Sequence, residues 1–122
     1  MSDHLLIVDD DPGLRELLAD YLGRNGFRVS GVADGRGLWA ALEQTPVDLV
    51  ILDLMMPEVD GFAVLDALRS KNETANIPVI VATAKELTVD EKSRLQGQIQ
   101  SLMMKGDFLN DEFLAEVRSL IR

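Results

Sequence analysis

The stretch HLLIVDDDPG, residues 4–13, joins a short apolar run directly to three adjacent aspartates. Residues 5–8 have the length and composition of a buried β-strand. The three carboxylates would then lie together at the carboxyl end of that strand. Like charges held so close repel one another unless a cation compensates them. The stretch therefore predicts a site for a cation, to which other residues of the chain can contribute.

The composition is that of one globular domain. The chain has 122 residues, of which 47% are hydrophobic, and this length suits a single domain. Its formal net charge of −9 argues against nucleic acid or an anionic membrane as a direct partner, because both bind basic surfaces. Residues 1–61, which include the aspartate run, hold twelve acidic and only four basic residues.

The sequence carries no sign of export or membrane insertion. It contains no cysteine, which excludes disulfides and thiolate metal sites and fits a reducing compartment. The first residues lack the basic region and the long apolar run of a signal peptide. No segment approaches the roughly 20 apolar residues of a membrane span. We expect a cytoplasmic protein that does not contact a membrane, with one domain over residues 1–122 and no output domain in this chain.

Short apolar segments alternate with helical patterns along the whole chain. Strands are expected at residues 5–8, 27–32, 48–54, 77–82 and 102–104, the second weakened by Gly31. Helical spacing or capping signals mark residues 14–22, 37–44 and 62–70, a capping box at 88–91, and a last helix capped by Asn110. This alternation predicts an α/β fold, a doubly wound five-stranded parallel sheet with helices on both faces.

Polar residues follow the strands of this predicted sheet. Ligands of such sheets bind at the carboxyl ends of the strands, so polar residues far apart in sequence converge there. The residues in question are Asp9, Asp10, Asp11, Asp53, Thr83 and Lys105. Carboxylate oxygens without histidine or cysteine suit Mg²⁺ or Mn²⁺. Because Mg²⁺ commonly binds one or two carboxylates together with phosphate oxygens, the sequence predicts a site for this ion and a phosphoryl group.

Simpler structural roles are open for some of these residues. Asp11 precedes Pro12, a favoured first residue of a helix, and can be a plain helix N-cap. Asp9 and Asp10 fit a solvated loop less well, because one acid suffices for a cap. His4 has no partner near it in the sequence and is predicted to be a surface residue without a role.

Taken together, Asp9 and Asp10 after an apolar strand, Asp53 in ILDLMMPEVDG, Thr83 after IPVIVA and Lys105 after LMM resemble the receiver domain of two-component response regulators. The resemblance covers essentially the whole chain and implies a flavodoxin-like fold of five βα units. It implies a phospho-accepting regulator and not an enzyme. A phosphohistidine on a sensor histidine kinase or phosphotransfer protein would be the donor, and a downstream target protein, which the sequence does not identify, would read the change.

The resemblance also implies roles for the acidic residues. Asp53 matches the aspartate that accepts the phosphoryl group. Asp10 and Asp53 match direct ligands of Mg²⁺, together with the backbone carbonyl of Met55. Asp9 matches an acid that holds the ion through water.

Two residues match groups that contact the phosphoryl oxygens, the hydroxyl of Thr83 and the amine of Lys105. The surface expected to change is formed by the fourth helix, the fifth strand and the fifth helix. The chain departs from the family at Gly106, where proline is usual, at Leu102, where an aromatic residue is common, and at residues 95–101, LQGQIQS, which replace a loop of small residues. How activation is transmitted therefore stays open.

Two other functions remain to be distinguished from the first. Haloacid dehalogenase-like enzymes also use an aspartate nucleophile, but they usually carry a second aspartate two residues later, where this chain has Met55. A chain of 122 residues also leaves little space for their inserted cap. A receiver-like module used only for docking usually lacks some of the acids or the lysine, whereas this chain has them all.

Overall fold

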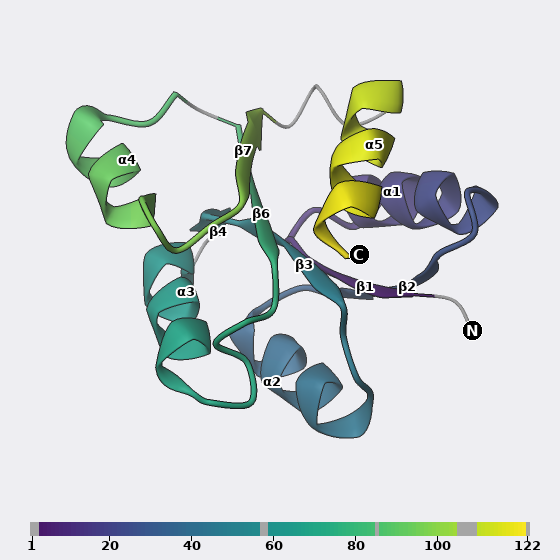
Figure 1. Ribbon diagram of the computed structural model, residues 1–122, viewed down its shortest axis with the longest axis horizontal. Helices are drawn as coiled ribbons and strands as arrows, with labels where there is room; N and C mark the ends of the chain where they lie inside the picture. Colours follow the sequence, from purple (N-terminus) through teal and green to yellow (C-terminus); the bar gives the residue numbers. More distant parts are fainter. Residues whose placement is uncertain (1–2, 57–58, 85, 105–109, 122) are drawn as a thin grey trace.

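A computed structural model describes residues 3–56, 59–84, 86–104 and 110–121 (Figure 1). Five parallel strands form one sheet in the order β2-β1-β3-β6-β7. They are β1 (His4–Val8), β2 (Arg28–Val32), β3 (Leu49–Asp53), β6 (Val79–Thr83) and β7 (Ser101–Met104). The predicted five-stranded parallel sheet is therefore confirmed. The chain proceeds outward in both directions from β1 and β3, and the carboxyl ends of these two strands flank the point where ligands bind in such folds.

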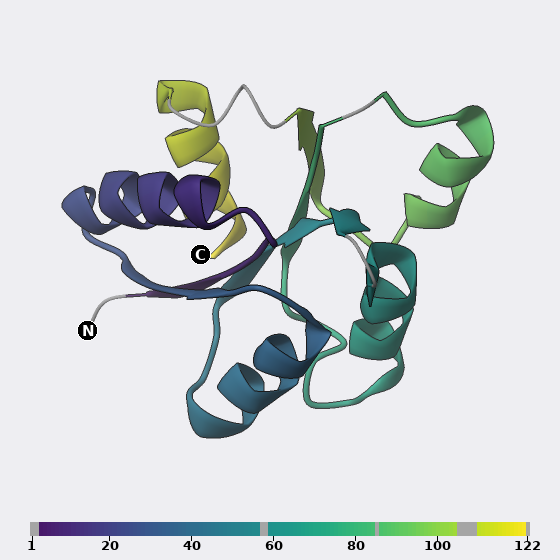
Figure 2. The ribbon, with the colours of Figure 1, turned by 180° about the vertical axis from the view of Figure 1, so that it is seen from behind.

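Five helices cover the two faces of the sheet. They are α1 (Pro12–Arg24), α2 (Gly35–Gln44), α3 (Gly61–Ser70), α4 (Val89–Leu95) and α5 (Asp111–Leu120). Figures 1 and 2 show α1 and α5 on one face and α2, α3 and α4 on the other, which is the predicted doubly wound arrangement. Within the described ranges, none of these helices has both the length and the apolar character that crossing a bilayer requires.

Each helix begins at a side-chain cap. The capping residues are Asp11, Asp34, Asp60, Thr88 and Asn110. Such caps satisfy backbone N–H groups that have no partner within the helix. The predicted capping box is present: the Thr88 N–H donates to the Glu91 carboxylate at 2.9 Å, and the Glu91 N–H donates to the Thr88 hydroxyl at 3.1 Å. The predicted cap at Asn110 is confirmed as well.

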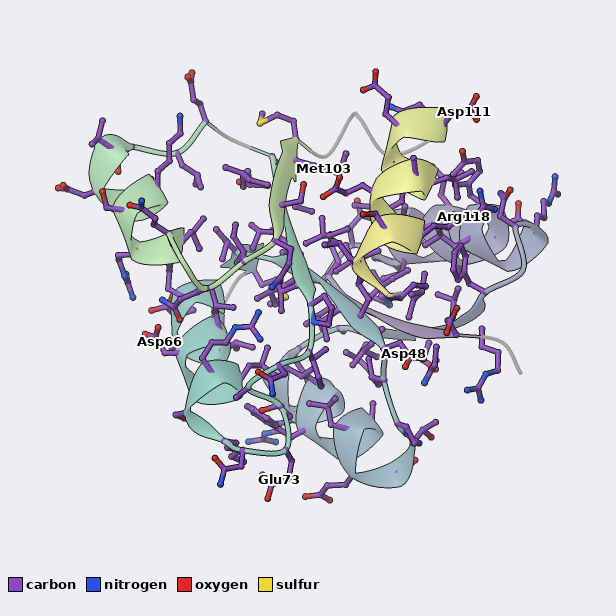
Figure 3. All side chains as sticks on the ribbon, viewed as in Figure 1. Asp48, Asp66, Glu73, Met103, Asp111 and Arg118 are labelled. Atoms are coloured by element: carbon purple, nitrogen blue, oxygen red, sulfur yellow. The ribbon has the colours of Figure 1, made fainter. Side chains whose placement is uncertain are left out.

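The core has two halves, one on each side of the sheet. Leu6 and Val8 of β1 pack toward α2, α3 and α4, whereas Leu5 and Ile7 pack toward α1 and α5. The strands β1, β3 and β6 are buried along their whole length. This explains their continuous apolar runs. Figure 3 shows side chains filling both layers, with the labelled Met103 on the α5 side of β7.

A short antiparallel ribbon after β3 was not predicted. It pairs β4 (Met55–Met56) with β5 (Val59–Asp60), and two-residue strands are too short to leave a periodic signal. The ribbon returns the chain to Gly61, the first residue of α3. A Cβ atom there would lie 2.5 Å from the Cα atom of Leu54, so this close approach requires glycine.

His4 is buried, and the prediction of a surface residue was wrong. Its side chain is 4% exposed. Nδ1 lies 2.9 Å from the carbonyl oxygen of Pro46, and Nε2 lies 2.7 Å from the hydroxyl of Ser30. Because a carbonyl only accepts, Nδ1 is the nitrogen that donates. The backbone N–H of His4 also donates to the Asp48 carboxylate at 2.8 Å. His4 thus joins β1 to β2 and to the segment before β3.

Candidate metal centre

Strand register brings the predicted acids together. β1 and β3 are neighbours, and Val8 pairs with Leu52. The residue after Val8 and the residue after Leu52 are both aspartates, so Asp9 and Asp53 lie at the same level of the carboxyl edge. One carboxylate oxygen from each of Asp9, Asp10 and Asp53 lies within 4.8 Å of the other two. The structure thus groups these three acids as the strand-end argument predicted.

The next strand along the sheet adds Thr83. Asp53 pairs with Ala82 of β6, so Thr83 is the following residue at the same edge. Thr83 is the last residue of its strand and is 1% exposed. It pairs in turn with Met104 of β7. Lys105, which directly follows Met104, and Gly106 both lie outside the described residues.

The three acids differ in environment. Asp9 and Asp53 are 2% and 1% exposed, whereas Asp10 is exposed to solvent. The backbone N–H of Asp9 donates to the carbonyl of Val32 at 3.1 Å, which ties the loop to β2. Its carboxylate accepts from the N–H of Asp11 at 2.9 Å. The loop after β1 is therefore held by hydrogen bonds and carries one buried acid, Asp9, and one solvent-exposed acid, Asp10.

The Asp11 carboxylate caps helix α1 and does not belong to the cluster of Asp9, Asp10 and Asp53. Its carboxylate accepts from the N–H groups of Gly13 and Leu14 at 2.9 and 3.3 Å. This confirms the structural role that the sequence left open, a helix N-cap followed by Pro12 at the first helical position.

The donor set fits a hard divalent cation. The three acids offer carboxylate oxygens, and neither imidazole nor thiolate is among the clustered groups of the described residues. Oxygen ligands of this kind suit Mg²⁺ and Mn²⁺. Met55, whose carbonyl is the remaining predicted ligand, begins β4 two residues after Asp53. The acids therefore meet the chemical requirement of the predicted ion.

A cavity beside Thr83 is lined by residues of β7 and by Lys92 of α4. Its volume is about 400 Å³, and Thr83, Leu87, Lys92, Leu102 and Met104 are among the residues that line it. Leu102 is 40% exposed. At the position where an aromatic residue is common in the family, this chain thus has a half-exposed leucine at the rim of a cavity that Thr83 also lines.

The sequence did not point to Arg15. Its Nη1 atom donates to the carbonyl oxygen of Asp9 at 2.6 Å. Arg15 is partly buried in the first turns of α1, and its guanidinium reaches back over the loop that carries the acids. An isolated basic residue on a helix gives no sequence signal of such a contact.

The chain matches a known family over nearly its whole length. Residues 5–118 match the family model described as the response regulator receiver domain. The transcriptional regulator RpaA of Synechocystis is 38% identical over 118 residues, which are 97% of this chain and 48% of RpaA. The response regulator MtrA of Mycolicibacterium smegmatis is 36% identical over 122 residues, 100% of this chain and 52% of MtrA. The chain spans about half the length of these curated relatives.

Solved receiver domains share the fold. The N-terminal domain of a response regulator receiver protein from Methanoculleus marisnigri is 33% identical with a TM-score of 0.79, and the alignment covers 98% of this chain and 97% of that domain. The receiver domain of the sensor histidine kinase PA1611 from Pseudomonas aeruginosa is 26% identical with a TM-score of 0.85, at 99% and 98% coverage. That structure has a magnesium ion coordinated in its active-site cleft.

Proposed function

Because this chain belongs to the response regulator receiver domain family, we propose that it is a phospho-accepting switch and that Asp53 accepts the phosphoryl group. The observation that carries this proposal is the position of Asp53. Its carboxylate is buried at the carboxyl end of β3, between Asp9 and Asp10 on one side and Thr83 on the other. A nucleophile in that place has charged and hydrogen-bonding groups around it that can hold a phosphoryl group.

The proposed cation is Mg²⁺, for which Mn²⁺ can substitute. Asp10, Asp53 and the backbone carbonyl of Met55 would hold it directly, and Asp9 through water. The magnesium ion in the cleft of the PA1611 receiver domain supports this proposal. When bound, the ion supplies positive charge that offsets the repulsion between the carboxylates and an anionic phosphoryl donor.

The residues of the chain position the transfer. An oxygen of the Asp53 carboxylate attacks phosphorus, the new P–O bond forms as the P–N bond to the donor histidine breaks, and the product is an acyl phosphate. The Thr83 hydroxyl donates a hydrogen bond to one phosphoryl oxygen, and the amine of Lys105 pairs with another. Both contacts stabilise charge that a phosphoryl group brings to the carboxyl edge of the sheet.

The proposed partners are proteins. A sensor histidine kinase or a phosphotransfer protein supplies the phosphoryl group, and a downstream target protein responds to a changed surface at α4, β7 and α5. RpaA and MtrA are named as DNA-binding regulators, but a net charge of −9 makes this chain itself unsuited to contact DNA. The chain acts as a regulator that catalyses only its own phosphorylation and dephosphorylation. The cytoplasmic location stays a prediction from the sequence.

Intact-mass measurement tests this proposal. With Mg²⁺ and acetyl phosphate, the wild-type protein should gain about 80 Da, the mass of one phosphoryl group. Asp53→Asn should gain nothing. Asp60→Asn is the matched control, because Asp60 lies seven residues away and caps α3, a task that asparagine performs equally well.

Two outcomes would contradict the proposal. A mass gain that persists in Asp53→Asn would place the phosphoryl group elsewhere. No gain with acetyl phosphate or a phosphoramidate, together with no binding of beryllofluoride, would indicate a module used only for docking. Beryllofluoride binding without a mass gain would instead indicate an intact site that hydrolyses its acyl phosphate rapidly.

A further inference from the structure

We propose that Arg15 is a positioning residue for the cation site, because its guanidinium fixes the peptide that carries Asp10. The inference rests on the proposed function, since it assumes that the clustered acids hold Mg²⁺. Arg15 itself contributes no oxygen ligand and acts only through the backbone. Neither the family match nor the motif that carries the resemblance gives Arg15 a role.

The contact joins a charged donor to the backbone of the site. Nη1 of Arg15 lies 2.6 Å from the carbonyl oxygen of Asp9, at the short end of hydrogen-bond distances. Within the described part of the chain, Arg15 forms no ion pair with a carboxylate. The guanidinium of Arg15 is therefore directed at the loop after β1 and not at a carboxylate.

The planar peptide bond links the contact of Arg15 to Asp10, the proposed metal ligand. The carbonyl group of Asp9 and the N–H group of Asp10 belong to one rigid plane. The opposite side of the loop is fixed by the bond from Asp9 N–H to Val32 and by the bond from Asp11 N–H to the Asp9 carboxylate. The bond from Arg15 and the two loop bonds thus hold the backbone on both sides of Asp10. The exposed carboxylate of Asp10 then stays directed toward Asp9 and Asp53.

Helix stability does not account for a basic residue at this place. Asp11 is the N-cap of α1, so Arg15 is the fourth helical residue, near the end where the helix dipole disfavours positive charge. The first turn of α1 contains no acidic residue that would balance it. In the structure, the guanidinium instead donates to the Asp9 carbonyl.

Gly31 provides the space that Arg15 occupies. A Cβ atom on Gly31 would lie 3.3 Å from Cδ of Arg15 and 3.6 Å from its Cβ. Gly31 lies on β2, opposite Ile7, where glycine is a poor strand residue. The same glycine that weakened the strand prediction thus lets the arginine stem pass over the sheet edge. A larger residue at this position should displace the guanidinium from the Asp9 carbonyl.

The test is the affinity for Mg²⁺ alone, measured by calorimetry on the unphosphorylated protein. Arg15→Met should weaken Mg²⁺ binding by about tenfold, as losing a group that orients a ligand typically does. Arg24→Met is the matched control, because it removes the same charge from an exposed site on the same helix, where Arg24 pairs with Asp20 at 3.2 Å. Its affinity should stay near that of the wild type.

Two further variants separate positioning from folding. Arg15→Lys keeps a donor and should recover part of the lost affinity, which a purely structural packing role would not require. Gly31→Val should weaken Mg²⁺ binding in the same direction even though valine favours strands. The melting temperature without Mg²⁺ shows that each variant is folded, and if Arg15→Met does not fold, the comparison between Gly31→Val and the wild type decides.

The outcomes distinguish this inference from the proposed function. Equal affinities for Arg15→Met and Arg24→Met, no recovery with Arg15→Lys, or wild-type affinity in Gly31→Val would each overturn the positioning role and leave the cation site intact. A wild-type protein that does not bind Mg²⁺, or whose binding is unaffected by Asp10→Asn, would overturn the proposed cation site and this inference with it.

Discussion

Replacing Arg69 by methionine should destabilise the fold by about 3 kcal/mol through lost hydrogen bonds. Arg69 lies at the end of α3. Its Nε atom donates to the carbonyl of Gln98 at 2.8 Å, and Nη1 donates to the carbonyls of Ala75 and Ile77 at 3.0 and 2.7 Å. Nη2 approaches the side chain of Gln100 at 3.4 Å. One guanidinium thus holds the segments that precede both β6 and β7.

The magnitude follows from the number and kind of these bonds. Burial lowers the pKa of Arg69 from its usual value, but an arginine stays charged in proteins, so its bonds are charge-assisted. Three such bonds at about 1.5–3 kcal/mol each set an upper range, and rehydration of the half-buried carbonyls reduces the net loss to about 3 kcal/mol. Methionine keeps the apolar stem, so packing changes little. A chain of this size should then melt about 10 °C lower.

Denaturation by urea, followed by the fluorescence of the single tryptophan, Trp39, measures the change. Arg94→Met is the matched control: Arg94 is exposed, lies 3.9 Å from Asp66 and stacks on Phe62 at 4.3 Å, and should cost less than about 1 kcal/mol. Hydrogen exchange should also accelerate at the amide of Val79, which donates to Gln100 at 2.7 Å. Equal losses for the two arginine variants would refute the reasoning.

Three other perturbations test separate parts of the structure. Saturating Mg²⁺ at 100 times its Kd should stabilise the wild type by about 2.7 kcal/mol and Asp10→Asn by far less, as thermal melting will show. Gly61→Ala should cost about 2 kcal/mol or more in urea denaturation, because the new Cβ would meet the backbone of Leu54 at 2.5 Å. His4→Leu should cost about 1–3 kcal/mol by the same assay, because it leaves the Ser30 hydroxyl and the Pro46 carbonyl without their partner.

The three central strands of the sheet were predictable because they are buried on both faces. β1, β3 and β6 are continuous apolar runs, and no helical pattern competes with them. The helix starts were predictable at Thr88 and Asn110 because capping is a local interaction. The β4–β5 ribbon was missed because strands of two residues are too short to show an alternating pattern. His4 was missed because its side-chain partners lie 26 and 42 residues away.

The residues of the site could be predicted from the sequence, but their arrangement in space could not. Alternation of strands and helices places Asp9, Asp53 and Thr83 at one edge of a parallel sheet, whatever the strand order. Their grouping depends on the order β2-β1-β3-β6-β7 and on the pairing of Val8 with Leu52, and neither can be read from local sequence. The contact of Arg15 could not be predicted either, because its partner is the backbone carbonyl of Asp9, and a backbone group leaves no signal in the sequence.

The two edges of the sheet are built differently, and this bears on how a phosphoryl group can act. At the amino edge, His4 joins β1 and β2 to the segment before β3, and Arg69 joins the segments before β6 and β7. These bonds tie together segments at the edge of the sheet away from the acids, so we expect a change at the acids to be taken up mainly at the carboxyl edge and in the elements attached there.

The proposed response surface includes the short helix α4 and strand β7. α4 has seven residues, and a cavity of about 400 Å³ lies between it, β7 and Thr83. The apolar side chains exposed nearby are Val89 at 79%, Leu102 at 40% and Met104 at 42%. A Thr83 hydroxyl drawn toward a phosphoryl group would alter the wall of that cavity, and Leu102 at its rim has room to move inward. Because a leucine offers no hydroxyl to bond in its new position, burial of apolar surface has to supply the free energy of such a movement.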